Sequence, residues 1–172
     1  MGLDIGVYNK LEGVSTSLDR DSDEYYNAGF LHLWQNPDFP GRAEGLDPNL
    51  SYKGERVLGF NAGSYSGYGQ WREKLARLAG YPPVMRKNYE DVRYESHAAG
   101  AWSVDAGPFW ELINFSDCEG IIGPVVSAKL ARDFQEHQEK ANSQLTGYDL
   151  ERYDSWRRAF ELAAENGVVR FG

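Results

Sequence analysis

The chain has 172 residues, the usual size of one compact domain, and no linker divides it, so we expect a single domain over residues 1–172. Its 26 acidic and 18 basic residues give a net charge of -8, which disfavours general binding to the phosphate backbone of nucleic acids. Hydrophobic residues make up 41% of the chain and aromatic residues 14%, a composition that excludes a disordered protein.

Cysteine content and the amino-terminal sequence predict the cellular location. The single cysteine, Cys118, cannot form an internal disulfide, and the start MGLDIGVY lacks the basic and long apolar segments of a signal peptide. The sequence contains no run of about 18 apolar residues, so we expect no membrane-spanning segment. We therefore expect a cytoplasmic protein without a membrane partner.

The first third of the chain has the patterns of strands joined by long loops. Leu3, Ile5 and Val7 alternate with small or polar residues, which is typical of a strand. Bulky residues over 29–34 and 52–60 predict two more strands. The acidic segment 15–24 reads as an exposed loop, and the prolines and glycines of 35–45 predict a second loop.

Helical patterns dominate the rest of the chain. Trp71, Leu75 and Leu78 recur at helical spacing, which predicts a helix over 71–79 with Trp71 in the core and a stop at Gly80. The same reasoning predicts, in chain order, a hairpin within 92–104, a short helix over 108–113, a helix beginning at 124, a helix over 150–165 and a strand over 168–171.

The order of these elements predicts the fold class. Strands dominate the first third of the chain and helices the last, without the strict strand–helix alternation of a parallel doubly wound sheet. We therefore expect an α+β fold, with an antiparallel sheet from the N-terminal half packed against three or more C-terminal helices.

The Gly/Ser-rich segment before the first helix is one candidate binding site. Glycines there would let backbone N–H groups converge, and Ser64 and Ser66 add hydroxyl groups beside the positive end of a helix, which suits an anion such as phosphate. The segment is neither a Walker sequence nor a dinucleotide-binding GxGxxG. Alternatively, Ser66 caps the helix while Tyr65 and Tyr68 cover a sheet edge.

Arg72 lies one turn into the same helix and off its apolar stripe. Its guanidinium could form a bidentate clamp on a phosphate or carboxylate group, or could pair with a surface glutamate.

The segment 114–120 is the second candidate site. It holds an amide, a hydroxyl, two carboxylates and a thiol, which suit recognition of sugar hydroxyls, cation binding or acid–base chemistry; these residues are Asn114, Ser116, Asp117, Cys118 and Glu119. Alternatively, Asp117 caps a short turn with Glu119 exposed beside it, and Cys118 is a small buried hydrophobic residue.

The three histidines, His32, His97 and His137, lack the spacing of zinc ligands, and His32 within its apolar segment is expected to be a satisfied, at least half-buried residue. We expect no metal and no other cofactor.

Four blocks of the sequence together resemble a family of small uncharacterised proteins encoded by tailed phages and prophages. The blocks are the start MGLDI, residues 39–45, the pattern AGSYSGYxxWRxxLAxLAGY from Ala62, and the pattern GPFxELINFSDxEGxIG from Gly107, continuing to Leu130. The resemblance covers nearly the whole chain and implies a phage protein in the cytoplasm of a host bacterium.

Small acidic phage proteins often act against the host, and one class sequesters nucleotide-derived immune signals without cleaving them. By analogy, and because aromatic, glycine/serine and basic residues suit such a ligand, we expect a homo-oligomer that binds a small anionic nucleotide-like molecule without turnover. Three segments would then converge on one cavity. In it Tyr65 and Tyr68 would stack on a base, and phosphate would be held by Ser64, Ser66, Arg42, Arg72 and Lys129. The predicted ligand-binding residues are Arg42, Glu44, Ser64, Tyr65, Ser66, Tyr68, Arg72, Asn114, Ser116, Asp117, Glu119 and Lys129.

Two alternatives belong to other functional classes. Asp117 and Glu119 could act as acid and base, or as metal ligands, in a metal-assisted phosphodiester hydrolase acting on such a signal. The acidic net charge could instead suit a module that binds a basic surface of a host protein.

Overall fold

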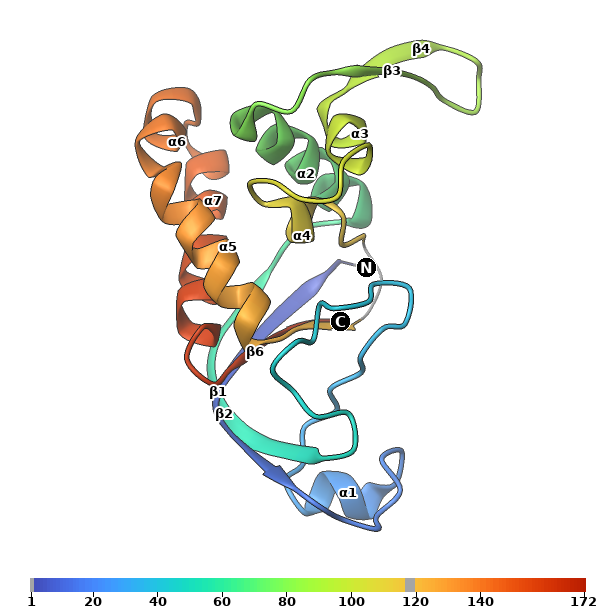
Figure 1. Ribbon diagram of the computed structural model, residues 1–172, viewed down its shortest axis with the longest axis vertical. Coiled ribbons are helices and arrows are strands. Elements are labelled where there is room, and N and C mark those ends of the chain that lie inside the picture. Colours follow the sequence, from blue (N-terminus) through green and yellow to red (C-terminus); the bar gives the residue numbers. More distant parts are fainter. Residues whose placement is uncertain (1, 117–119) are drawn as a thin grey trace.

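The computed structural model describes residues 2–116 and 120–172 and shows a four-stranded sheet between a group of helices and a long loop (Figure 1). All neighbouring strands are antiparallel, in the order β2 (Ser51–Asn61), β1 (Asp4–Val14), β6 (Val168–Phe171) and β5 (Gly120–Ile122). This confirms the predicted α+β class. Only two of the four strands come from the N-terminal half, because β5 and β6 complete the sheet from the C-terminal half.

The helices gather mainly at one side of the sheet. They are α1 (Asp23–Asn27), α2 (Tyr65–Ala79), α3 (His97–Trp102), α4 (Trp110–Ile113), α5 (Pro124–Glu136), α6 (Gln138–Gln144) and α7 (Tyr148–Ala163). Helices α5 and α7 pack against each other, and α7 also packs on β1. Within the residues described, no helix has the length and apolar character needed to cross a membrane.

The two faces of the sheet bury two separate cores. Because side chains alternate along a strand, Ile122 and Val169 belong to the large core beneath the helices, whereas their neighbours Ile121 and Val168 belong to a small core on the opposite face. A loop over residues 29–50, which we call the strap, contributes Leu46 to this small core. The strap therefore acts as the second layer over the sheet.

Helix packing in the large core is dominated by aromatic rings. Trp71 is fully buried, as its place on the apolar stripe predicts, and the rings of Phe134 and Tyr153 meet edge to face at 4.8 Å. The rings of Trp156 and Phe171 stack at 5.6 Å and join α7 to β6. The predicted strand over 168–171 and the predicted helix start at Pro124 are both confirmed.

The predicted strand over residues 29–34 is wrong. Only Leu31 pairs with the sheet, through its N–H and the carbonyl oxygen of Tyr52 at 2.8 Å. Phe30 turns instead to the ring of Tyr25, 4.8 Å away. Packing of the strap thus buries Phe30 and half-buries Leu31 and Leu33, whereas Trp34 is exposed. Pro37 lies too close in the sequence for a strand ladder to continue.

The predicted hairpin within 92–104 is also displaced. The hairpin joins β3 (Val84–Lys87) to β4 (Arg93–Ser96), and the residues that follow form α3. Glu73 of α2 explains the helix, because its carboxylate accepts hydrogen bonds from the backbone N–H groups of His97 and Ala98 at 2.6 and 3.0 Å.

Candidate functional site: the strap and its pocket

The Gly/Ser-rich segment is the capped first turn of α2 rather than an open loop. Ser64 is the N-cap residue, and its hydroxyl oxygen accepts a hydrogen bond from the N–H of Gly67 at 3.1 Å and lies 3.1 Å from the hydroxyl oxygen of Ser66. Tyr65 is 45% exposed. Tyr68 is fully buried and its hydroxyl donates to the carbonyl oxygen of Phe115 at 2.9 Å, so its ring is not open to stack on a base.

Both arginines that were predicted to hold phosphate contact the backbone of α4. Arg72 donates to the carbonyl oxygen of Ile113 at 3.1 Å. Arg42, a residue of the strap, is buried, donates through Nε to the carbonyl oxygen of Glu111 at 3.0 Å and covers the ring of Trp110 at 4.8 Å. Burial lowers the pKa of Arg42, and nearby Glu111 opposes that shift. These guanidinium groups therefore satisfy carbonyl groups that a short helix leaves open.

Lys129 is engaged in the same region. Its ammonium group lies 2.6 Å from a carboxylate oxygen of Glu111 and 2.7 Å from one of Asp133. Asp133 in turn accepts a hydrogen bond from the N–H of Phe109 at 2.8 Å. Because Phe109 has a left-handed φ of 56°, this network fixes a strained residue at the start of α4.

The second candidate segment adds little to a cavity within the described residues. Asn114 donates to the carbonyl oxygen of Trp110 at 3.0 Å, and Ser116 is half-buried. Asp117, Cys118 and Glu119 lie outside the described residues. In the described part of the chain, no cluster of three or more histidine, cysteine, aspartate or glutamate side chains could hold a metal ion.

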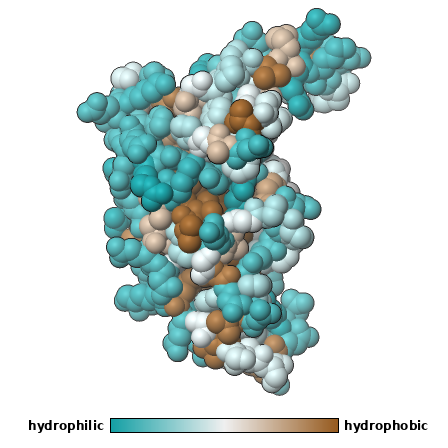
Figure 2. All heavy atoms as spheres, viewed as in Figure 1, coloured by the Kyte–Doolittle hydropathy of each residue, from teal (hydrophilic) through white to brown (hydrophobic). Residues whose placement is uncertain are grey.

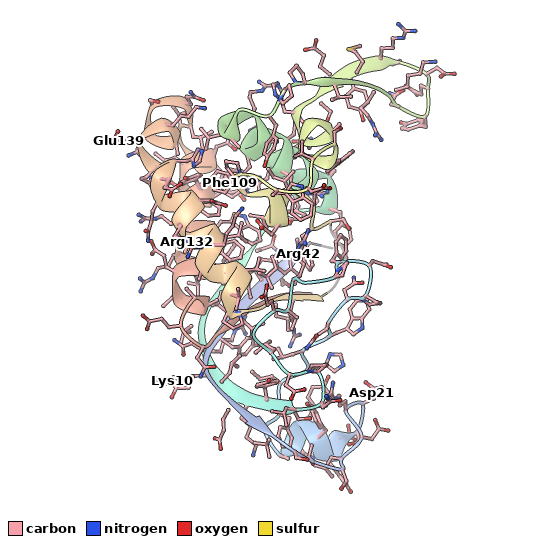
Figure 3. All side chains as sticks on the ribbon, viewed as in Figure 1. Lys10, Asp21, Arg42, Phe109, Arg132 and Glu139 are labelled. Atoms are coloured by element: carbon pink, nitrogen blue, oxygen red, sulfur yellow. The ribbon has the colours of Figure 1, made fainter. Side chains whose placement is uncertain are left out.

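The convergence of the three segments on one cavity stays a prediction, because Asp117 and Glu119 lie outside the described residues. The described members of the three segments that contact each other do so around the backbone of α4, and among the predicted residues only Arg42 and Glu44 line one of the pockets described here. Figure 3 shows Arg42 between the strap and α4, well separated from Asp21 near α1.

Two hollows of about 380 Å³ lie along the strap. One is lined mostly by residues of 35–46, including Arg42 and Glu44, and the other, which we call the strap pocket, also reaches α1 and β2. Its apolar walls come from α1, the strap, β2 and β5, and its lining residues are Arg20, Asp21, Tyr25, Leu31, His32, Leu33, Trp34, Gln35, Leu46, Pro48, Leu50, Ser51, Tyr52 and Ile121. Figure 2 shows hydrophobic side chains reaching the surface in this lower part of the molecule.

One rim of the strap pocket is polar. His32 Nε2 lies 3.6 Å from Asp21 Oδ1, and both side chains are solvent-accessible, at 42% and 87%. Arg20 donates to the carbonyl oxygens of Pro48 and Leu50 at 2.9 and 3.0 Å, which holds the end of the strap in place. The formal charges of Arg20 and Asp21 cancel, so the rim carries polar groups with little net charge.

Trp34 divides the strap pocket from a smaller hollow. It lines both, and the second has a volume of about 200 Å³ beside Arg170 and Phe171. Trp34 is 46% exposed. A large aromatic side chain is thus available to a ligand on this side of the sheet.

The far half of the strap is fixed against α5. The N–H of Gly123 donates to the carbonyl oxygen of Arg42 at 2.7 Å. A side chain on Gly123 would place its Cβ only 2.8 Å from the carbonyl oxygen of Glu44, so the close approach requires glycine. Since the strap is anchored at Arg20, Arg42 and Gly123, the strap pocket is formed before any ligand binds.

The strap pocket was not among the predicted sites, although several of its residues lie where the sequence indicates. Arg20 and Asp21 are exposed in the predicted loop 15–24, and His32 is half-buried as expected, whereas Trp34 was expected in a strand. The sequence of residues 29–34 did contain an indication of this arrangement. Bulky side chains occur at successive positions rather than at every second one, and prolines follow soon after. This pattern also fits a loop that packs on a sheet.

Comparison of the chain with protein-family models, with curated proteins and with solved structures finds no match.

Proposed function

We propose that this protein binds a small aromatic ligand of the nucleoside class in the strap pocket and sequesters it without chemical change. The observation that carries the proposal is the preformed hollow of about 380 Å³ with apolar walls and one polar rim. Sites of this size and composition are typical of small-molecule binding.

The aromatic lining supports a flat heterocyclic ligand. Trp34 and Tyr52 line the pocket, and His32 lies at its polar rim. Stacking of a base on an aromatic side chain contributes about 1–3 kcal/mol, and hydrogen bonds to the rim would fix the orientation of the polar edge of the base.

The charges near the pocket favour a nucleoside over a ligand rich in phosphate. Arg20 is offset by Asp21 and already donates to two carbonyl groups. Arg42, Arg72 and Lys129, which were expected to hold phosphate, make contacts inside the protein. We therefore propose a nucleoside, which carries little charge, in place of the anionic nucleotide expected from the sequence.

The geometry of the rim favours binding over catalysis. General acid–base groups work best when they are positioned within hydrogen-bond reach and shielded from water. The nitrogen–oxygen distance of 3.6 Å between His32 and Asp21 is longer, and both groups are exposed. Together with the resemblance to phage-encoded proteins, this supports removal of a host-derived molecule from solution as the biological role.

Calorimetric titration with the common ribonucleosides, their monophosphates and a cyclic dinucleotide tests the proposal. We expect a nucleoside to bind, and Trp34→Ala to weaken that binding roughly tenfold because a stacking surface is lost. Trp102→Ala is the matched control, since Trp102 is also 46% exposed but lies on α3.

Two results would contradict the proposal. One is the absence of binding by every member of the panel; the other is equal affinity of the wild type and Trp34→Ala. Recovery of a chemically altered ligand after incubation would contradict sequestration while leaving the binding site in place.

A further inference from the structure

The β3–β4 hairpin projects from the body beyond α3 (Figure 1). Every residue from Val84 to Glu95 is exposed, including apolar side chains such as Met85 and Tyr94, which are 57% and 46% exposed. A two-stranded sheet without a covering layer is only marginally stable in water, so such an arm gains stability from a partner.

Backbone geometry shows which groups this arm offers. The N–H of Asn88 donates to the carbonyl oxygen of Val92, so these two residues form a hydrogen-bonded pair. Hydrogen-bonded pairs alternate along an antiparallel ladder, and the next one is Arg86 with Tyr94. The backbone N–H and C=O groups of Tyr94 therefore point toward β3. The same alternation turns the N–H and C=O groups of Arg93 and Glu95 toward the outer edge of β4. No hydrogen bond to these outward groups is present among the residues that the structure describes. The outer edge of β4 is therefore open to a further strand.

The side chains of β4 are complementary to a second β4 strand. If two copies pair antiparallel about a two-fold axis through Tyr94, Arg93 lies opposite Glu95 of the partner subunit, and the reverse pair also forms. Both residues have outward backbone groups, so this register gives two hydrogen-bonded pairs with opposite charges. Strand β3 has Arg86 and Lys87 but no acidic residue, so two β3 edges would repel each other.

The apolar side of the arm fits the same arrangement. Residues directly opposite in a ladder share a face, so Tyr94 lies on the face of Arg86, whose guanidinium covers the ring of Trp102 at 5.1 Å. Two Tyr94 rings would then meet at the two-fold axis. On the face drawn in Figure 2, hydrophobic side chains are visible where the arm leaves the body.

We propose that a second copy of this chain pairs with the first, β4 to β4, and forms a four-stranded sheet that spans a symmetric dimer. The shared edge is short, because β4 has only 4 residues. The dimer is therefore expected to be weak and to depend on protein concentration.

Sedimentation equilibrium over a concentration series reaching the millimolar range tests this pairing. Arg93→Glu places two glutamates opposite each other across the axis, and Glu95→Arg does the same with two arginines. We expect each to raise the dimer dissociation constant at least about tenfold, and the double variant to restore it because both pairs are reversed.

Arg93→Glu also keeps the hairpin folded. Arg93 lies opposite Lys87 within the arm, so the substitution replaces a like-charge pair by an opposite-charge pair. Loss of the dimer in this variant therefore cannot come from loss of the hairpin. Arg132→Glu on α5 makes the same change in net charge at an exposed site and should leave the dimer intact.

Amide hydrogen exchange adds a second readout. Dimerisation should protect the amides of Arg93 and Glu95, whereas the Tyr94 amide is already bonded inside the hairpin. A monomer at every concentration overturns the proposal, whether or not another macromolecule binds the arm. A dimer that persists unchanged in Arg93→Glu and in Glu95→Arg overturns it as well.

Discussion

Arg42 joins two parts of the molecule that have little structure of their own. It lies in the strap, and its guanidinium contacts both a carbonyl oxygen and an indole ring of α4, a helix of 4 residues. A helix this short is not stable by itself, because nucleation costs more than its few hydrogen bonds return. One side chain therefore contributes to the order of both segments.

Replacing Arg42 by alanine should lower the free energy of unfolding by about 2–3 kcal/mol, because a buried charge-assisted hydrogen bond is lost and the carbonyl of Glu111 is left without it. Urea unfolding measures the effect. Arg132→Ala is the exposed control, with a change expected within about 0.5 kcal/mol. Equal stability of the two variants would show that the Arg42 contact contributes nothing.

Residue types alone could not decide the role of these cations. Arg42, Arg72 and Lys129 have the chemistry of phosphate ligands, but the same chemistry suits carbonyl groups at the end of a helix. The short helix predicted over 108–113 is present as α4, but the sequence does not show that these side chains would contact it. Burial of Trp71 could be predicted, since its helix shows a clear apolar stripe.

At the scale of elements, α3 depends on a residue from another helix. Glu73 of α2 accepts hydrogen bonds from two backbone N–H groups of α3 and from the hydroxyl of Ser96. Partial burial alone would raise the pKa of Glu73, but these hydrogen bonds outweigh burial and lower the pKa below its ordinary 4.5. The spacing of Glu73 and Arg77 also fits a local ion pair, so the long-range role was not visible in the sequence.

The lowered pKa of Glu73 predicts an acid-sensitive contribution to stability. The folded state favours the ionised carboxylate, so the contribution is complete above the ordinary pKa of 4.5 and is lost as the pH falls through the lower folded pKa. We expect Glu73→Gln to be less stable than the wild type by about 1–2 kcal/mol at neutral pH.

Urea unfolding at a series of pH values tests this linkage. The stability difference between the wild type and Glu73→Gln should shrink below pH 4.5. A constant difference across the whole series would mean that protonation of Glu73 has no effect on folding.

The contact between the strap and α5 makes a further prediction. In Gly123→Ala, the new Cβ would lie 2.8 Å from the carbonyl oxygen of Glu44, so the strap must move, at a cost of about 1–3 kcal/mol. Ligand affinity in the strap pocket should fall with it.

Gly69→Ala is the matched control for Gly123→Ala. Its Cβ would meet no atom within 4 Å, and alanine in a helix should stabilise the protein by about 0.5–1 kcal/mol. Thermal unfolding of both variants measures the contrast. A stable Gly123→Ala variant with unchanged affinity would show that the strap is not fixed there.

Elements with strong local signals could be predicted, and those defined by distant partners could not. Helices α2, α5 and α7 have apolar stripes, and α2 ends at its predicted stop, although α7 begins at Tyr148 rather than at 150. The strap has no regular hydrophobic pattern, because those of its apolar side chains that pack inside, such as Leu46, are buried by a sheet that forms from other segments. The strap pocket could not be predicted for the same reason.

At the scale of the whole molecule, the two proposed binding surfaces lie far apart. The strap pocket is near α1 at one end, and the β3–β4 arm projects from the other end (Figure 1). Dimerisation through the arm therefore leaves the two pockets open. Arg93→Glu should abolish the dimer without changing nucleoside affinity, which calorimetry on the same sample can check.

The position of β6 has a consequence for how the protein is made. Strand β6 lies between β1 and β5, and Asp4 exchanges two backbone hydrogen bonds with Gly172, at 2.8 and 3.0 Å. During translation, β1 and β2 leave the ribosome more than a hundred residues before β6, a delay on the order of ten seconds at typical rates of synthesis. Throughout that interval, the edge of β1 that carries Ile5 and Val7 has no partner strand on the β6 side, so the four-stranded sheet is completed only when synthesis reaches the C-terminal strand.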